Sequence, residues 1–261
     1  MKLPKISQSL IKGYVDYLNE KECGVFFKAN YIDKDPDAQK EPSDAMRSGI
    51  YFEYLCTGAL PRNNEIPEPD VVYKGKPNEK MSAPFERATE SAKIFKSLIE
   101  HYGIKILSVG LSLTDGEISG VVDIHAEWDG REVFIDLKYS GLIDDKWNEM
   151  GWDLESLPQK DSLMIQGVHY KLLAKKCLGI ENIPFYYFVF SSTDPMNVKI
   201  ILQEVDETKS QNHIVAIQNV IGKLQNDKFV ARPTMQRCSK CPLNHKCESK
   251  VNFPLVDTIY Y

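Results

Sequence analysis

Three charged side chains interrupt or close two apolar runs near the middle of the sequence. Asp123 lies inside the first run, and Asp136 and Lys138 end the second. Carboxylates prefer hard divalent cations such as magnesium or manganese. A lysine beside such an ion can orient a water and offset the charge that develops on a phosphate. These residue types indicate metal-dependent phosphate chemistry, provided that the fold brings them together.

The dipeptide Asp129-Gly130 separates the two runs and favours a hairpin with a type I′ turn. Trp128 then faces Arg131, paired residue numbers add to 259, and Asp123 is predicted to face Asp136. Like charges placed there destabilise a sheet, and a dication would convert their repulsion into coordination. The alternative is a surface hairpin with solvated acids. The register also gathers the apolar side chains on the other face: Val122, Ile124, Ala126, Val133, Ile135 and Leu137.

The elements that must position these residues follow from periodicity and from turn residues. The predicted order is helices, three strands, helices, two strands, a helix and a cysteine segment, which is an α/β sandwich around a mixed sheet. A long loop from about 58 to 83 is a candidate functional flap. The predicted helices are 7–20, 46–58, 85–102, 144–151, 160–178 and 207–226, and the strands outside the hairpin are 104–113, 184–192 and 197–205.

Composition predicts an ordinary cytoplasmic protein of 261 residues with a net charge of -5. The longest apolar stretch is too short to span a bilayer, and the N-terminus lacks the apolar core of a signal peptide. The net charge gives no global attraction to nucleic acid, so any basic surface must be local. One local bias exists, because 221–250 contains seven Lys or Arg residues but two acids.

On the helix 160–178, Gln166 and Tyr170 are four residues apart and are predicted to share the side opposite Met164, Val168 and Leu172. An amide and a phenol placed together could hydrogen-bond a phosphate or a base. Any amphipathic helix also carries such residues on its polar side.

Cys238, Cys241 and Cys247 form a Cys-x2-Cys-x5-Cys segment, which invites zinc or an iron-sulfur cluster. The candidates for a fourth ligand are His245 and Cys23. Ligation by Cys23 would close a loop of more than 200 residues, with a stabilisation of about 4 to 5 kcal/mol by analogy with disulfides. The remaining cysteines are expected to be ordinary buried thiols: Cys56 and Cys177.

Together these motifs resemble the PD-(D/E)XK nuclease superfamily in its RecB-like branch. Within that branch they are similar to the iron-sulfur exonucleases, namely the CRISPR-associated RecB-like nucleases and the nuclease domain of AddB. Gly120-Val121-Val122-Asp123 resembles the first strand motif, Asp136-Leu137-Lys138 the D/E-x-K motif, and Gln166-x3-Tyr170 the motif of the RecB branch. Cys23 with the C-terminal cysteines resembles the one-plus-three arrangement that holds a 4Fe-4S cluster.

The resemblance implies roles for individual residues. Glu53, Asp123, Asp136 and the Leu137 carbonyl would bind one or two magnesium or manganese ions, and Lys138 would position the attacking water. Gln166 and Tyr170 would contact DNA. RecB has a metal-binding His in a Gly-x3-His pattern where this chain has Gly49-x3-Glu53, and Val122 replaces the family proline. The iron-sulfur ligands would be Cys23, Cys238, Cys241 and Cys247.

The expected protein is one RecB-like nuclease domain spanning 1–261, in which an N-terminal helical segment, 1–60, and the cysteine segment, 227–261, pack together at the iron-sulfur site. Its expected activity is exonucleolytic hydrolysis of DNA, preferring single strands, in recombination, repair, phage replication or CRISPR spacer acquisition. A recombination or CRISPR-adaptation protein is a possible partner. No Gly-x4-Gly-Lys-Ser/Thr loop is present, so no use of ATP is expected. The alternative is a non-catalytic module that binds DNA ends beside an integrase or helicase.

Overall fold

The structure is a computed structural model. It describes residues 4–39, 41–61, 64–72, 75, 77, 79–148, 150–153, 161–226 and 229–250, of which 161–164 are described by backbone alone. The chain divides into two compact units. The sheet unit is Pro42–His213, and the terminal unit joins Met1–Glu41 to Ile214–Tyr261. In the described residues, no helix combines the length and the apolar character that crossing a membrane requires.

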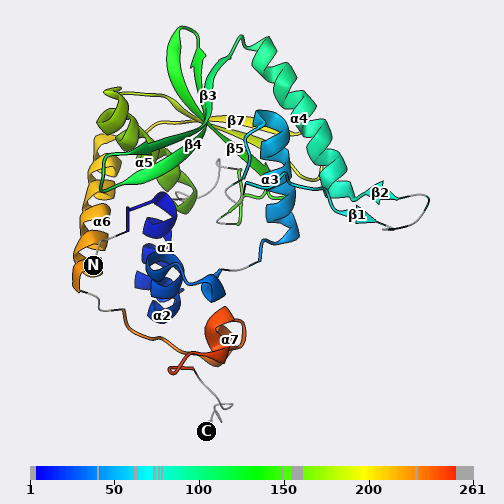
Figure 1. Cartoon of the computed structure of the whole chain (residues 1–261). Coiled ribbons are helices and arrows are strands. Elements are labelled where there is room, and N and C mark those ends of the chain that lie inside the picture. The colour runs from blue at the N-terminus through cyan, green and yellow to red at the C-terminus, as the bar shows by residue number, and fades with distance from the viewer. Residues whose placement is uncertain are drawn as a thin grey trace. The chain divides into compact units, whose positions relative to one another are not determined.

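The described residues of the sheet unit form a five-stranded mixed sheet in the order β3-β4-β5-β6-β7 (Figure 1). β5 and β6 are parallel and are joined through helix α5 (Asp161–Leu178), whereas the other neighbouring strands are antiparallel. This is the predicted mixed α/β architecture. The strand bounds are β3 Lys105–Thr114, β4 Ser119–Trp128, β5 Arg131–Ser140, β6 Phe185–Ser191 and β7 Val198–Gln203.

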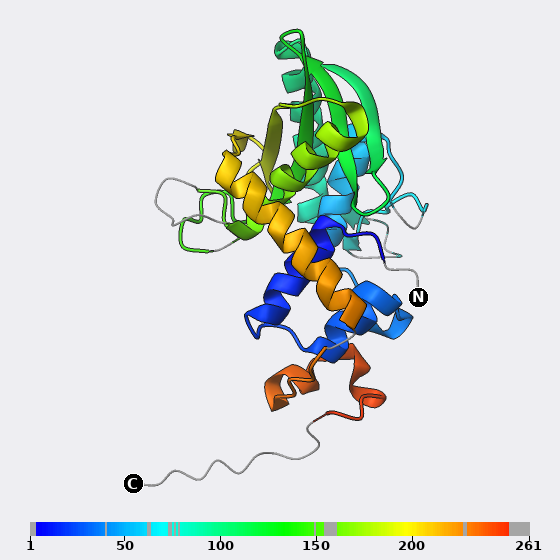
Figure 2. The ribbon, with the colours of Figure 1, turned by 90° about the vertical axis from the view of Figure 1, so that its left-hand side faces the viewer.

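Helices cover both faces of this sheet (Figure 2). α3 (Asp44–Thr57) and α4 (Ala83–His101) lie on one face, and α5 lies on the other. Phe52, Phe85 and Phe95 from α3 and α4 are almost fully buried against the apolar side of the central strands. The apolar side chains of β4 and β5 in this cluster therefore face α3 and α4, whereas Asp136 of β5 faces α5.

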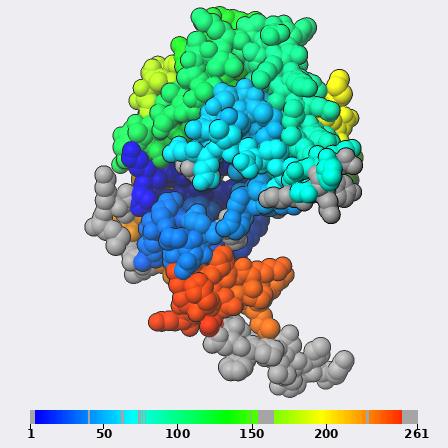
Figure 3. Space-filling view, turned by 45° about the vertical axis from the view of Figure 1, so that its right-hand side comes forward, coloured from blue at the N-terminus to red at the C-terminus, as the bar shows by residue number. Residues whose placement is uncertain are grey.

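The predicted long loop between α3 and α4 contains two short paired strands, β1 (Val71–Val72) and β2 (Lys80–Met81). The space-filling view shows these cyan residues on the same side as α3, in light blue (Figure 3). Gly58 ends α3 in a left-handed conformation, with φ of 70°, which glycine adopts without steric cost.

The terminal unit gathers short helices from both ends of the chain. α1 begins after the cap Ser7, whose Oγ accepts a hydrogen bond from the Leu10 N–H at 3.2 Å. An aromatic cluster packs behind it, with Phe27 contacting Tyr17 and Phe229 at centroid distances of 5.9 and 5.1 Å. The helices are α1 Gln8–Leu18, α2 Gly24–Phe27, η1 Lys28–Asp33, η2 Pro36–Ala38, α7 Met235–Ser239 and η3 Pro242–His245, while α6, Glu207–Asn226, contains the boundary between the units.

The prediction of a helix at 144–151 was wrong, because the described residues of that segment form turns. The Asp145 carboxylate accepts hydrogen bonds from the backbone N–H groups of Trp147 and Asn148, at 2.9 and 3.1 Å. The Asn148 side chain accepts another from the Met150 N–H at 2.9 Å. Such local side-chain acceptors compete with helical backbone bonds and favour a turn.

Candidate active site and cysteine pocket

The predicted hairpin register is confirmed. β4 and β5 pair from Trp128 with Arg131 to Ile124 with Ile135, and the residue numbers of every pair add to 259. Asp129 and Gly130 have positive φ angles of 51° and 72°, as the type I′ turn requires. The six apolar residues predicted to share a face are buried.

The regular pairing of β4 with β5 ends one residue before the acids. A continued register would bring the Leu137 N–H opposite Val122. Instead the Asp123 carboxylate accepts a hydrogen bond from the Leu137 N–H at 2.9 Å. The side chain of Asp123 thus replaces a backbone carbonyl in the ladder, which fixes this carboxylate beside β5.

Asp136 lies at the centre of a polar group on the α5 side of the sheet. Its Oδ1 accepts a hydrogen bond from the Gln166 amide, and its Oδ2 forms an ion pair with the Lys138 ammonium. The Asp136 side chain is 2% exposed and the Lys138 side chain 31%, so the acid is enclosed while the lysine side chain is partly exposed. The strand repeat predicted that these two residues would be neighbours on one face.

The two acids perturb each other strongly. Burial, then the negative charges of Asp136 and Glu53, raise the pKa of Asp123 well above its ordinary value. Burial also raises the pKa of Asp136, although Lys138, Asp123 and Gln166 oppose this rise. Burial acts to lower the pKa of Lys138, but the charges of Asp136 and Asp123 outweigh it and raise that pKa. The ammonium therefore stays protonated at neutral pH, and the carboxyl pair has an increased affinity for a proton.

Glu53 comes from α3, on the other side of the sheet from α5. Its charge raises the pKa of both Asp123 and Lys138, so the structure brings this third carboxylate within electrostatic reach of the acid pair. Among the described residues, no group of three or more His, Cys, Asp or Glu side chains has the arrangement of a metal site. Asp136 is directed instead at Lys138 and Gln166.

Tyr170 was expected on the polar side of its helix, but this residue is only 7% exposed and packs against the sheet. Its hydroxyl donates to the Val121 carbonyl at 2.6 Å, and its ring stacks on Phe185 with centroids 5.8 Å apart. Burial and the charges of Asp136 and Asp123 raise its pKa. Sequence periodicity could not separate a polar helix side that faces solvent from one that covers buried acids.

Gly120 has a structural role that the sequence did not predict, namely to admit the Tyr170 ring of α5. A Cβ at this position would overlap the Tyr170 ring, so glycine allows α5 to approach β4. This approach brings Gln166, one helical turn before Tyr170, to Asp136. A glycine at the start of the Gly-Val-Val-Asp strand could have indicated this close approach, because glycine within a strand often marks one.

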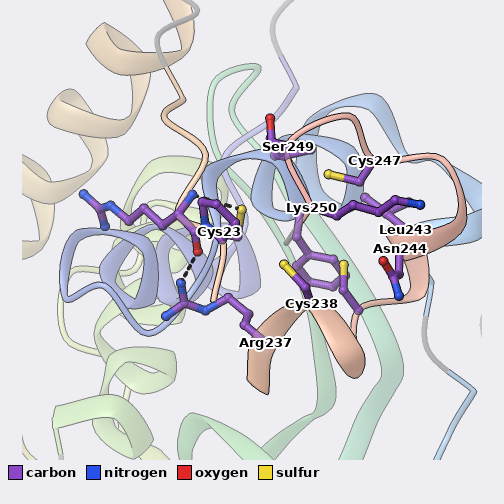
Figure 4. A pocket seen from close by; sticks show the side chains of 13 residues that line it. Cys23, Arg237, Cys238, Leu243, Asn244, Cys247, Ser249 and Lys250 are labelled. Atoms are coloured by element: carbon purple, nitrogen blue, oxygen red, sulfur yellow. Dashed lines mark hydrogen bonds between the residues drawn. The ribbon is translucent and has the colours of Figure 1, made fainter. Parts of the chain in front are cut away.

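In the terminal unit, all four cysteines of the predicted cluster line one pocket (Figure 4). Burial, with the charges of the other three thiols, raises the pKa of Cys241, so all four sulfurs lie within electrostatic reach of one another. His245, the other candidate for the fourth ligand, is not among the lining residues. Its side chain is 62% exposed, and its ring nitrogens contact Pro242 and Asp37.

Cys23 is brought to this pocket by a close approach of two chain segments. The Gly24 N–H donates to the Val230 carbonyl at 3.1 Å, and the Arg232 N–H donates to the Cys23 sulfur at 3.4 Å. A Cβ on Gly24 would overlap the Val230 carbonyl oxygen. Glycine after Cys23 is therefore needed for the N-terminal thiol to meet the C-terminal ones.

We expect Gly24→Ala to destabilise the terminal unit, because the backbone around Val230 must shift to admit the methyl group. A loss of about 1 to 3 kcal/mol is the usual effect of overpacking at a tight site. Chemical denaturation followed by circular dichroism measures it. Gly222→Ala is the matched control, since a Cβ there meets no atom within 4 Å and alanine favours the α6 helix. Equal stability of the two variants would contradict the close-approach argument.

Comparison with known proteins finds a similar fold among solved structures. No family model and no curated protein matches the sequence. The crystal structure of a protein described as "Putative exonuclease" from Eubacterium rectale superposes with a TM-score of 0.65 at 19% identity, covering 98% of this chain and 91% of that chain. The structure of SSO0001 covers 62% of this chain and 68% of its own, with 14% identity and a TM-score of 0.32, which is too low to support an argument. The first likeness shows a shared fold over nearly the whole chain.

Proposed function

We propose that this chain is a metal-dependent exonuclease that hydrolyses phosphodiester bonds in DNA, with a preference for single strands. The observation that supports it most is the buried pair of acids, Asp123 and Asp136, joined to a protonated Lys138. Perturbed carboxylates beside a charged lysine are typical of sites that bind metal and phosphate. The shared fold with the Eubacterium rectale protein is consistent with this activity.

The donor set suits magnesium or manganese. Asp123 and Asp136 are hard oxygen donors whose repulsion a dication would relieve, and Glu53 adds a third negative charge nearby. Among the described residues, the buried Asp136 Oδ2 forms an ion pair with Lys138 and accepts no regular hydrogen bond. Glu53, Asp123, Asp136 and the Leu137 carbonyl are the proposed ligands. A bound ion would supply Lewis-acid activation of water and neutralise charge on the phosphate.

Three other residues would position the water, orient Asp136 and hold α5 in place. Lys138, held protonated by the acids, would donate a hydrogen bond to the attacking water and stabilise charge on the phosphate. Gln166 would orient Asp136 through its amide, and Tyr170 would hold α5 against β4 through the Val121 carbonyl. Since the Tyr170 hydroxyl is occupied by this bond, its proposed contribution to DNA binding is one of positioning.

The four cysteines of the pocket are proposed to hold a 4Fe-4S cluster with a structural role. Four thiols that line one pocket match in number and type the ligand set of such a cluster. The N–H of Arg232 at Cys23 is the kind of hydrogen bond that stabilises a thiolate ligand. Zinc is the competing occupant, because Cys₄ sites also bind it. A cluster here would join the two ends of the chain within the terminal unit.

The test is degradation of end-labelled single-stranded and double-stranded oligonucleotides with manganese or magnesium. We expect Lys138→Ala to lower the rate about 100-fold, as loss of one preorganised charge typically does. Lys138→Arg should recover part of it. Lys176→Ala, which removes a lysine paired with Asp115, is the matched control and should leave the rate unchanged.

The alternative is a non-catalytic module that binds DNA ends with an integrase or helicase. Absence of cleavage by the wild type with every divalent metal, together with retained binding, would favour the module. Loss of cleavage in Lys138→Ala and in Asp136→Ala with binding retained would favour the enzyme.

A further inference from the structure

An exposed tryptophan lies on the connection between the two elements that carry the acid site. Trp147 belongs to the loop 141–152, which follows β5 directly and begins three residues after Lys138. The side chain is 78% exposed. A tryptophan so fully exposed to water is uncommon in a folded protein and marks a binding surface more often than a packing site.

The loop is a built structure that presents Trp147 at a defined place. Its ends are joined by a hydrogen bond from the Trp152 N–H to the Leu142 carbonyl at 2.9 Å. Ile143 and Trp152 are each 3% exposed, and the Trp152 ring packs on Tyr187 with centroids 5.2 Å apart. Ile143 and Trp152 therefore anchor the loop, while the Trp147 side chain is exposed.

Two acidic side chains beside Trp147, those of Asp144 and Asp145, bind other groups of the protein. Asp145 caps the turn that contains Trp147. Asp144 forms an ion pair with Lys199 at 3.1 Å and accepts a hydrogen bond from Asn197 at 2.6 Å. Lys146 places its ammonium 5.2 Å from the centroid of the Trp147 ring. Lys146 and Trp147 thus place a positive charge beside an exposed aromatic ring.

Topology places this loop where a ligand is expected. β5 and β6 are parallel, and ligands of such sheets bind outside the carboxyl ends of the strands. The loop leaves the carboxyl end of β5, and the turn after β6 carries Met196, which is 79% exposed. The bond between Asn197 and Asp144 joins the two connections. Lys138 also lies near the carboxyl end of β5, two residues before the strand ends.

We propose that Trp147, assisted by Lys146, stacks on a base of the single-stranded DNA whose phosphate lies at Lys138. This inference deepens the nuclease function proposed above and rests on it. An aromatic ring with an adjacent cation is the characteristic chemistry of single-strand binding, because every base has a π-face. Bases inside a duplex are already stacked on their neighbours, so this contact discriminates in favour of a single strand.

The test uses full-length protein carrying Asp136→Asn, so that binding is measured without cleavage. Fluorescence anisotropy of a labelled single-stranded oligonucleotide should show that Trp147→Ala weakens binding about 5- to 100-fold, the effect of losing one stacked base. Trp147→Phe should retain most of the affinity. Binding of a blunt duplex should change less than about twofold. Tyr102→Ala is the matched control, since this aromatic is 42% exposed but packs on Trp128 at the turn end of the hairpin.

Intrinsic fluorescence gives an independent measurement. Trp152 is buried and Trp128 is packed against Tyr102 and Tyr186, so single-stranded DNA should quench mainly Trp147. The quenching should disappear in Trp147→Phe. Equal affinity of Trp147→Ala and its parent would overturn this inference even if the wild type cleaves DNA. Weakened binding without any wild-type cleavage would support it while rejecting the nuclease.

Discussion

Asp123→Asn is expected to abolish nuclease activity and to make the protein more stable. The substitution removes the charge of a buried carboxylate whose pKa is raised by burial and by the charges of Asp136 and Glu53. The amide oxygen of the new side chain can still accept a hydrogen bond from the Leu137 N–H. Loss of a proposed metal ligand should lower the cleavage rate at least about 1000-fold. Relief of the repulsion should raise Tm by about 2 to 4 °C, which corresponds to about 1 kcal/mol. Oligonucleotide degradation with manganese and thermal unfolding measure the two effects.

The stability gain of Asp123→Asn should depend on pH in a defined direction. Because the folded-state pKa of Asp123 is raised, the folded state binds the proton more tightly than the unfolded state does. The contribution of this carboxyl group to stability is fully present below its unfolded pKa of about 4. It is lost as the pH rises through the folded pKa. The difference in Tm between variant and wild type should therefore shrink as the pH falls from 8 to 5.

Asp115→Asn is the matched control, since this aspartate lies in the connection between β3 and β4 and its pKa is shifted in the opposite direction. Burial acts to raise its pKa, but Lys176 and the N–H groups of Ile118 and Glu117 outweigh it and lower the pKa. The substitution should lower Tm and leave cleavage unchanged. An active Asp123→Asn variant, or one less stable than wild type at pH 8, would contradict the role assigned to the acid pair.

The second large effect is expected from Cys23→Ser. If Cys23 completes a four-thiolate cluster, anaerobically purified variant protein should lose the broad absorbance near 400 nm and most of its iron. Its terminal unit should lose about 4 to 5 kcal/mol of stability, the value expected for a staple across such a long loop. Absorbance, metal analysis and chemical denaturation provide the measurements.

Cys177→Ser is the matched control, because Cys177 lies on α5 and does not line the pocket. It should keep the colour and the iron content of the wild type. A colourless wild type containing one zinc per chain would reject the iron-sulfur part of the proposal. A Cys23→Ser variant that stays brown would reject Cys23 as a ligand.

The sequence was sufficient wherever a structural choice depends on neighbours in the chain. Asp129-Gly130 accepts the two positive φ angles of its turn, and one apolar face permits a single register. The predicted placement of Asp136 and Lys138 on one face follows from the same alternation. The end of α3 at Gly58 also depends on a residue within the chain segment itself.

What depends on distant partners was decided by the tertiary structure. The ladder breaks at Asp123 because its carboxylate takes the place of a backbone acceptor, and Tyr170 is buried because Gly120 leaves room for it. Apolar spacing suggested a helix at 144–151, but Asp145 and the anchoring of Trp152 on Tyr187 hold a loop there. Likewise Cys23 reaches the other thiols through the contact of Gly24 with Val230. Periodicity records which face of an element is apolar, whereas the identity of the group opposite that face is set by packing across the chain.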